Sequence, residues 1–185
     1  MKIRIHNHHG ARGFTVLELL TAIAVMAILV GWGFPSLQTM IRNNQVAAQN
    51  AELVSMLNFA KGEAIRRNTD VPVILTATDD GWGAIVEDPA EEADVEGCVP
   101  GQLRCATYNR VDLVGLDLPS GDSILTFNNR GYIIDPDQPL TFASGTMFLQ
   151  HENCEGNRQR TRIDITATGQ INSCTLACDD DDTGC

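Results

Sequence analysis

The feature that most constrains this chain is an apolar stretch near its N-terminus that contains a single carboxylate. From Phe14 to Phe34 the chain has 21 residues, and Glu18 is the only charged one. As a helix with a rise of about 1.5 Å per residue, this stretch is long enough to cross the hydrocarbon core of a membrane. An acid inside a membrane costs about 2.5 to 3.5 kcal/mol on insertion scales, so a free-standing anchor would be more stable without it. Glu18 is therefore a candidate functional residue for which we expect a cationic partner.

A short basic segment before this stretch predicts how the chain lies in a membrane. Lys2, Arg4 and Arg12 precede the apolar run, and no acid does. Because positive charge stays on the cytoplasmic side, we expect a cytoplasmic N-terminus and export of the rest. An ordinary secretory signal has its small-residue cleavage site after the apolar run, whereas Gly13 precedes it. Cleavage there would leave the anchor on the chain; an ordinary single-span anchor is the alternative interpretation.

The segment GFTVLELLTAIAVMAILVGWGFP, from Gly13 to Pro35, resembles the signal of type IV prepilins and type II secretion pseudopilins. The resemblance implies that a prepilin peptidase cleaves after Gly13 and methylates the new N-terminal amine of Phe14. Glu18 then lies at the place of the family's glutamate, and Pro35 at the place of its helix-kinking proline. The carboxylate of Glu18 can pair with the N-terminal amine of a neighbouring subunit when apolar helices bundle into a filament.

After Pro35 the pattern remains helical, and it predicts one long helix from Phe14 to Arg67. Apolar residues recur at steps of about three and four residues; they are Leu37, Ile41, Val46, Leu53, Val54, Leu57, Ala60, Ala64 and Ile65. Pro35 removes a backbone donor, so we expect a kink there. Four segments follow: a leader (1–13), a membrane or filament-core half of the helix (14–34), an amphipathic half (35–67) and a β-rich exported region (68–185).

Beyond the helix, β-branched and alternating runs predict antiparallel strands joined mostly by short turns. The expected strands are Val71–Ala77, Trp82–Val86, Ser123–Phe127, Gly131–Ile134, Leu140–Phe142, Thr146–His151, Thr161–Ala167 and Gln170–Ser173. The interval Glu87–Pro119 is less regular, and we interpret it as an excursion at the sheet edge. The fold class is therefore α+β. The resemblance to prepilins implies a pilin-like arrangement, with the helix packed on an antiparallel sheet and a disulfide-tied C-terminal region.

All the cysteines lie in the region expected to be exported, which favours disulfides. They are Cys98, Cys105, Cys154, Cys174, Cys178 and Cys185. Six cysteines allow 15 connectivities, and the sequence does not choose among them. Pairing sequence neighbours gives Cys98–Cys105, Cys154–Cys174 and Cys178–Cys185 as the expectation. A metal site is the weaker alternative because no CxxC pair occurs.

Two further segments are similar to the GspH/FimT (FimT/FimU) type of minor pilin. One runs from Val46 to Asn68, and the other comprises FNNRGY at Phe127–Tyr132 with the closing strands around Gly169. DNA-binding relatives often carry arginines in a GRxR pattern near the last turn, where this chain has GQIN. An alternating arginine cluster keeps a DNA contact open, although a solvated strand face is the favoured interpretation; its members are Arg158, Arg160 and Arg162.

The charge argues against nucleic acid as a general partner. Removing the three leader bases from the formal net charge of −11 leaves −14, whereas phosphate binding needs clustered bases. Four consecutive acids offer oxygen ligands for calcium but are more often a solvated tail; they are Asp179, Asp180, Asp181 and Asp182. No cofactor is expected, and no catalytic motif occurs, so we expect a structural subunit and not an enzyme.

Together these patterns predict a minor pilin of a type IV pilus that takes part in assembly at or near the tip. The alternatives are a minor pseudopilin of a type II secretion system and a DNA-binding minor pilin for natural transformation. The expected partners are other pilins, the prepilin peptidase and the inner membrane. The expected location is a single pass through that membrane with a periplasmic domain, followed by incorporation into an extracellular pilus or a periplasmic pseudopilus.

Overall fold

The computed structural model describes residues 14–78, 80–118, 123–135, 138–152, 154–156 and 158–181, without the side chains of 32–35 and 138–142. The chain divides into two compact units, Met1–Thr39 and Met40–Cys185. One helix, α1 (Val16–Arg67), begins in the first unit and ends in the second. The predicted helix is confirmed to within two residues at its N-terminal end. Arg66 and Arg67 occupy its last turn, where positive charge complements the helix dipole.

The second unit contains two antiparallel sheets. The first has the order β3-β2-β1-β5-β6-β7, and the second has the order β10-β9-β8-β4. The strands of the first sheet are β1 (Val71–Thr78), β2 (Gly81–Glu87), β3 (Gln102–Asn109), β5 (Ile124–Phe127), β6 (Ile133–Asp135) and β7 (Gln138–Phe142). Those of the second are β4 (Val111–Asp117), β8 (Gly145–His151), β9 (Gln159–Ile165) and β10 (Ile171–Ala177). The expected α+β fold is confirmed, with two sheets in place of the single sheet predicted.

The interpretation of Glu87–Pro119 as irregular was wrong in its second half, because β3 and β4 lie there. The edge strand β3 is half-buried along most of its length, so it lacks the alternation of apolar and polar residues that marks a strand with one buried face. In β4 the register shifts between Val114 and Asp117, around Gly115, which has a φ of 60°. That irregularity interrupts the alternation begun by Val111 and Leu113.

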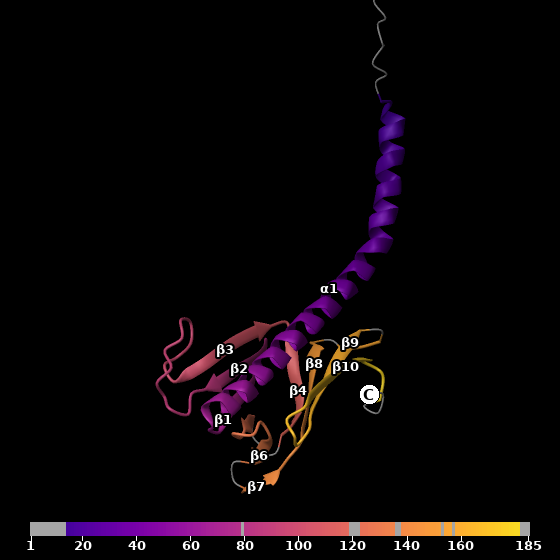
Figure 1. Ribbon diagram of the computed structural model, residues 1–185. Helices are drawn as coiled ribbons and strands as arrows, with labels where there is room; N and C mark the ends of the chain where they lie inside the picture. Colours follow the sequence, from indigo (N-terminus) through magenta and orange to yellow (C-terminus); the bar gives the residue numbers. More distant parts are fainter. Residues whose placement is uncertain are drawn as a thin grey trace, which may run out of the picture. The chain divides into compact units, whose positions relative to one another are not determined.

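The core of the second unit lies between α1 and the two sheets (Figure 1). One face of the helix is buried at steps of three and four residues, as an amphipathic helix requires; its buried residues include Val46, Leu53, Met56, Leu57, Ala60 and Ala64. Alternate residues of the strands complete the same cluster, among them Val73 and Leu75 of β1, Met147 and Leu149 of β8, and Ile163 and Ile165 of β9. Both sheets are therefore attached to one helix face.

Two disulfides join described cysteines. Cys98–Cys105 closes the loop before β3, as predicted. Cys154 is bonded to Cys178, so the expected pairs Cys154–Cys174 and Cys178–Cys185 are wrong. Pairing by nearness in sequence failed because the antiparallel arrangement of β9 and β10 brings the segments before β9 and after β10 together. Cys174 is also disulfide-bonded, and Cys185 lies outside the described residues.

Candidate assembly site and domain junctions

The N-terminal end of α1 is capped by Thr15. Its side-chain oxygen accepts a hydrogen bond from the backbone N–H of Glu18 at 3.2 Å, and its carbonyl accepts one from Leu19 at 3.2 Å. A threonine followed three residues later by a glutamate is the spacing of a capping box. Glu18 therefore lies in the first turn, where the helix dipole favours a negative charge. The sequence interpretation missed Thr15, although the capping-box spacing could have identified it.

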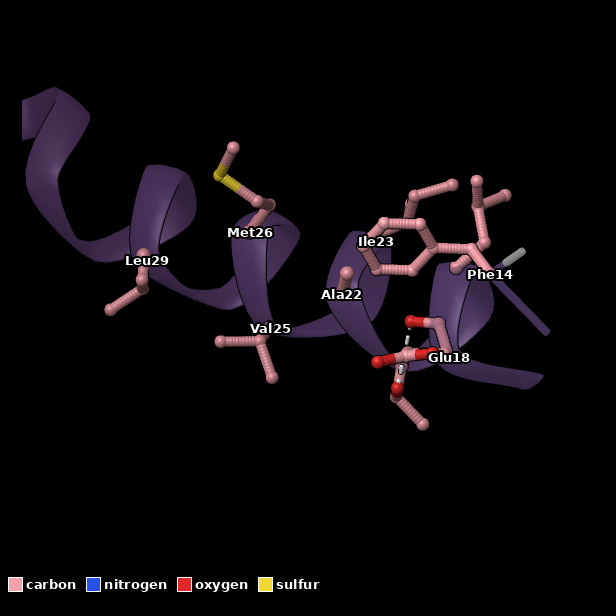
Figure 2. A pocket seen from close by; sticks show the side chains of 9 residues that line it. Phe14, Glu18, Ala22, Ile23, Val25, Met26 and Leu29 are labelled. Carbon is pink, nitrogen blue, oxygen red and sulfur yellow. Dashed lines mark hydrogen bonds between the residues drawn. The ribbon is translucent and has the colours of Figure 1, made fainter. Parts of the chain in front are cut away.

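A row of apolar side chains follows Glu18 along the helix. Figure 2 shows Phe14 beside Glu18, with Ala22, Ile23, Val25, Met26 and Leu29 continuing along α1. Phe14 is 81% exposed and Met26 is 66% exposed. Exposed apolar surface of this extent marks a segment that packs against lipid or against other apolar helices. Within the described part of this row, Glu18 is the one ionisable side chain.

The same helix is long and apolar enough to cross a membrane. Its most apolar 18-residue window has a mean hydropathy of 2.1 and is unburied in the structure. This finding rests on the length and composition of the helix, and a signal sequence has the same properties. Pro35 lies within the bounds of α1, so the predicted kink stays a prediction, as its side chain is among those not described. Gly13, the predicted cleavage residue, lies outside the described residues.

A second feature is the junction of two turns beneath the helix. Gly131 follows β5 and Gly169 lies between β9 and β10, and both have left-handed φ angles, 77° and 71°. A side chain at Gly169 would collide with the carbonyl oxygen of Gly131. From α1, Lys61 donates a hydrogen bond from Nζ to the carbonyl oxygen of Gly169 at 2.8 Å. The two segments that resemble the GspH/FimT type, the second half of α1 and the turns at Gly131 and Gly169, therefore meet at this junction.

A third feature joins the C-terminal end of α1 to the loop before β3. The carboxylate of Asp88 is buried, and its Oδ1 accepts a hydrogen bond from the guanidinium of Arg67 at 2.7 Å. The N–H groups of Ala90 and Ala93 also donate to this carboxylate. These partners distinguish Asp88 from the nearby acids Glu91 and Glu92, which are exposed. Nothing in its local sequence distinguishes it from those acids, because Arg67 is distant in the chain.

The predicted arginine cluster lies in and just before β9, and all three of its members have interactions within the protein. Arg160 lies over the ring of Phe148, 5.2 Å from its centroid, and donates to the carbonyl oxygen of Asp180 at 2.6 Å. Arg162 pairs with Asp164 at 2.9 Å. These contacts fit the interpretation of a solvated strand face whose positive charges are balanced by nearby oxygen-bearing groups. Arg158 also has an interaction within the protein, so a DNA contact would have to compete with existing ones.

The acidic tail begins with aspartates that bind backbone groups. Asp179 accepts a hydrogen bond from the N–H of Gly156, and Asp180 accepts one from the N–H of Ala177. Asp181 has an interaction of its own, and Asp182 lies outside the described residues. Across the described ranges, no three His, Cys, Asp or Glu side chains lie together in a way that could hold a metal ion.

Comparison with protein families decides the assignment. The model of the family "Type II transport protein GspH" matches residues 49–169, which is well over half of the chain. This chain belongs to the GspH family. A second model, the "Prokaryotic N-terminal methylation motif", matches residues 8–34, which contain the predicted leader and the apolar segment. Among curated proteins no match was found.

One solved structure supports the fold of this GspH-family chain. A crystal structure of the type IV minor pilin FimU of Pseudomonas aeruginosa PAO1 matches with a TM-score of 0.51 and 18% identity, covering 72% of this chain and 90% of that one. A second crystal form of FimU matches with a TM-score of 0.47 and 18% identity, covering 66% and 87%. At 18% identity, the match with a TM-score of 0.51 shows the fold alone.

Family and fold together give a coarse function. The chain is a minor pilin or pseudopilin, a structural subunit of the kind that assembles with other pilins in a filament. Its apolar N-terminal helix fits a membrane-anchored pilin with a periplasmic domain. As a pilin-family protein, the chain has the role of a structural subunit and not of an enzyme.

Proposed function

We propose that this chain is a minor pilin of a type IV pilus that helps to start assembly at or near the filament tip. The observation that carries the proposal is the exposed apolar row of α1 with Glu18 in its first turn. In lipid, an ionised carboxylate needs a partner of opposite charge. The N-terminal amine of a neighbouring subunit is such a partner, because it is a cation and lies level with Glu18 when the neighbouring parallel helix is shifted along its axis by about one turn.

The proposal includes maturation of the N-terminus. Prepilin peptidase cleaves after Gly13, and Phe14 receives a methyl group on its new amine, which remains basic. Support comes from the methylation motif over residues 8–34 and from Phe14, which lies immediately before the capped helix. Mass spectrometry of the N-terminal peptide tests this step. A chain isolated from cells that begins before Gly13, or begins at Phe14 without a methyl group, would contradict it.

The assembly role is tested by a Glu18→Ala variant scored separately for processing and for incorporation. We expect normal removal of the leader and loss of the variant from the sheared filament fraction. Thr21→Ala is the matched control, since Thr21 is a polar residue one turn further along whose hydroxyl bonds only the local carbonyl of Glu18. A Glu18→Ala subunit that is processed and incorporated as well as the control would exclude the pairing mechanism.

The second candidate is a minor pseudopilin of a type II secretion system, which the name of the matching family, Type II transport protein GspH, favours. Deleting the gene separates the two candidates. Loss of surface pili with unchanged export of folded proteins supports the pilus. The reverse result supports the secretion system, in which the periplasmic location of the domain would be permanent.

A further inference from the structure

His151 occupies an unusual position at the end of β8. Alternation along this strand places it on the same face as Met147 and Leu149, both of which are fully buried in the core beneath α1. His151 thus continues a row of core side chains. Its Nδ1 is inaccessible to solvent and has no hydrogen-bond partner among the residues that the structure describes. A buried polar nitrogen without a partner costs free energy that a carbon at the same place would not.

The helix contacts β9 next to this histidine. Gln150 pairs with Arg160 across β8 and β9, so Gln159 lies beside His151. The backbone N–H of Gln159 donates to Oδ1 of Asn43 on α1 at 3.2 Å. Val46, one turn further along the helix, is buried. A hydrogen bond between α1 and β9 therefore lies beside His151.

Charged groups on α1, on β4, after β8 and before β9 act on His151. Arg42 of α1 and Arg158 before β9 disfavour a positive charge on the imidazole of His151. Asp112 of β4 and Glu152 after β8 favour that charge. Burial is the largest effect and lowers the pKa of His151, and the two arginines lower it further against the two acids. The neutral imidazole is thus the form that this packing accommodates.

We propose that His151 is a pH-sensitive latch: the neutral imidazole holds α1 against β8 and β9, and its protonation loosens that contact. Protonation puts a charge and a second N–H at a place where the ring nitrogen is already buried without a partner. His151 is partly exposed at the end of β8, so its buried Nδ1 edge gains water when the ring shifts from its place on the core face of that strand. The chain is suited to testing this, because His6, His8 and His9 are its other histidines and all lie in the segment before Gly13.

The amide of Gln159 reports on the latch because its hydrogen bond crosses to the helix. The experiment measures its hydrogen-exchange protection factor, corrected for the intrinsic rate, in the full chain in detergent micelles between about pH 7.5 and about pH 5. We expect protection to fall by about five- to tenfold, the change expected when one hydrogen bond is lost. In His151→Phe, which fills the space without titrating, we expect no fall. Asn43→Ala, which removes the acceptor, should give low protection at every pH and so calibrates the readout.

Two results would overturn the proposal. One is a Gln159 protection factor that does not change with pH in the unmodified chain. The other is an equal fall in His151→Phe, which would assign the effect to the acids Asp112 and Glu152. If His151→Phe does not fold, His151→Gln replaces it. The NMR resonance of the His151 imidazole can be followed in the unmodified chain, without a variant at that position. This resonance should change over the same pH range as the protection of the Gln159 amide. A change over a different pH range contradicts the latch.

Discussion

The guanidinium of Arg67 lies 2.7 Å from the buried carboxylate of Asp88 and so joins the end of α1 to the end of the first hairpin. Asp88 is 3% exposed, whereas the side chain of Arg67 is 27% exposed. Arg67 also contacts Glu63 on its own helix, 2.9 Å away. Hydrogen bonds from Arg66 and, to a smaller extent, Arg67 lower the pKa of Glu63 against the effect of its burial. The helix end therefore has an ordered set of charges that positions the loop from 88 to 101.

Removing either partner of this pair should destabilise the fold, and the two changes should differ. Asp88→Ala deletes the acceptor of two backbone N–H groups as well as that of Arg67, so we expect the free energy of unfolding to fall by about 2 to 4 kcal/mol. Arg67→Gln leaves those two bonds in place and should cost about 1 to 2 kcal/mol, because its guanidinium is partly solvated. Urea unfolding of the full chain in micelles measures both. Equal losses would show that the loop bonds of Asp88 contribute little.

Gly169→Ala should be among the most destabilising single-methyl changes in this chain. The residue has a φ of 71°, and the added carbon would collide with the carbonyl oxygen of Gly131. We expect a loss of about 2 to 4 kcal/mol in the free energy of unfolding. Gly62→Ala is the matched control, because Gly62 is helical and has open space around its added carbon, so this change should stabilise by up to about 1 kcal/mol. If Gly169→Ala leaves the free energy of unfolding unchanged, the turn relaxes away from Gly131.

These junctions show where sequence reasoning succeeds and where it stops. Gly13, Phe14, Glu18 and Pro35 could be proposed as a set because local spacing defines a prepilin signal. The helix and eight strands could be predicted because each has a periodic pattern of its own. The partners Arg67 and Asp88, or Lys61 and Gly169, depend on how the chain folds back on itself, which no local pattern records. The same limit explains the wrong pairing of Cys154.

The two described disulfides should contribute unequally to stability. Cys154 and Cys178 are separated by 24 residues, and Cys98 and Cys105 by 7. In the chain-entropy account a longer loop gives more stabilisation, about 3 kcal/mol for the first and about 2 kcal/mol for the second. Replacing each pair by serines and comparing the free energies of unfolding checks the order. Non-reducing peptide mapping checks the connectivity, and a peptide joining Cys154 to Cys174 would contradict the structure.

Thr15 should control the order of the first turn of α1. Thr15→Ala removes the oxygen that accepts the N–H of Glu18, and loss of an N-cap costs about 1 kcal/mol. We expect faster exchange of the Glu18 amide in micelles and weaker incorporation of the subunit, because the carboxylate would be held less firmly. Thr15→Ser retains the hydroxyl and should behave like the unmodified chain. Equal exchange in the alanine and serine variants would show that the cap is dispensable in an apolar environment.

The contribution of Asp112 to the free energy of unfolding should rise as the pH falls through the pKa of this residue in the folded state. Burial, followed by the nearby charge of Glu152, raises the pKa of Asp112, while His151 opposes them. An acid with a raised pKa in the folded state binds its proton more tightly there than in the unfolded chain, so its contribution is greatest below the unfolded value of about 3.9. That contribution is lost as the pH rises through the folded pKa. Asp112→Asn should therefore raise the free energy of unfolding at pH 7 and remove this dependence. Asp117→Asn, an exposed acid of the same strand, controls for the loss of one negative charge, and an equal gain in both variants would point to net charge instead of the site.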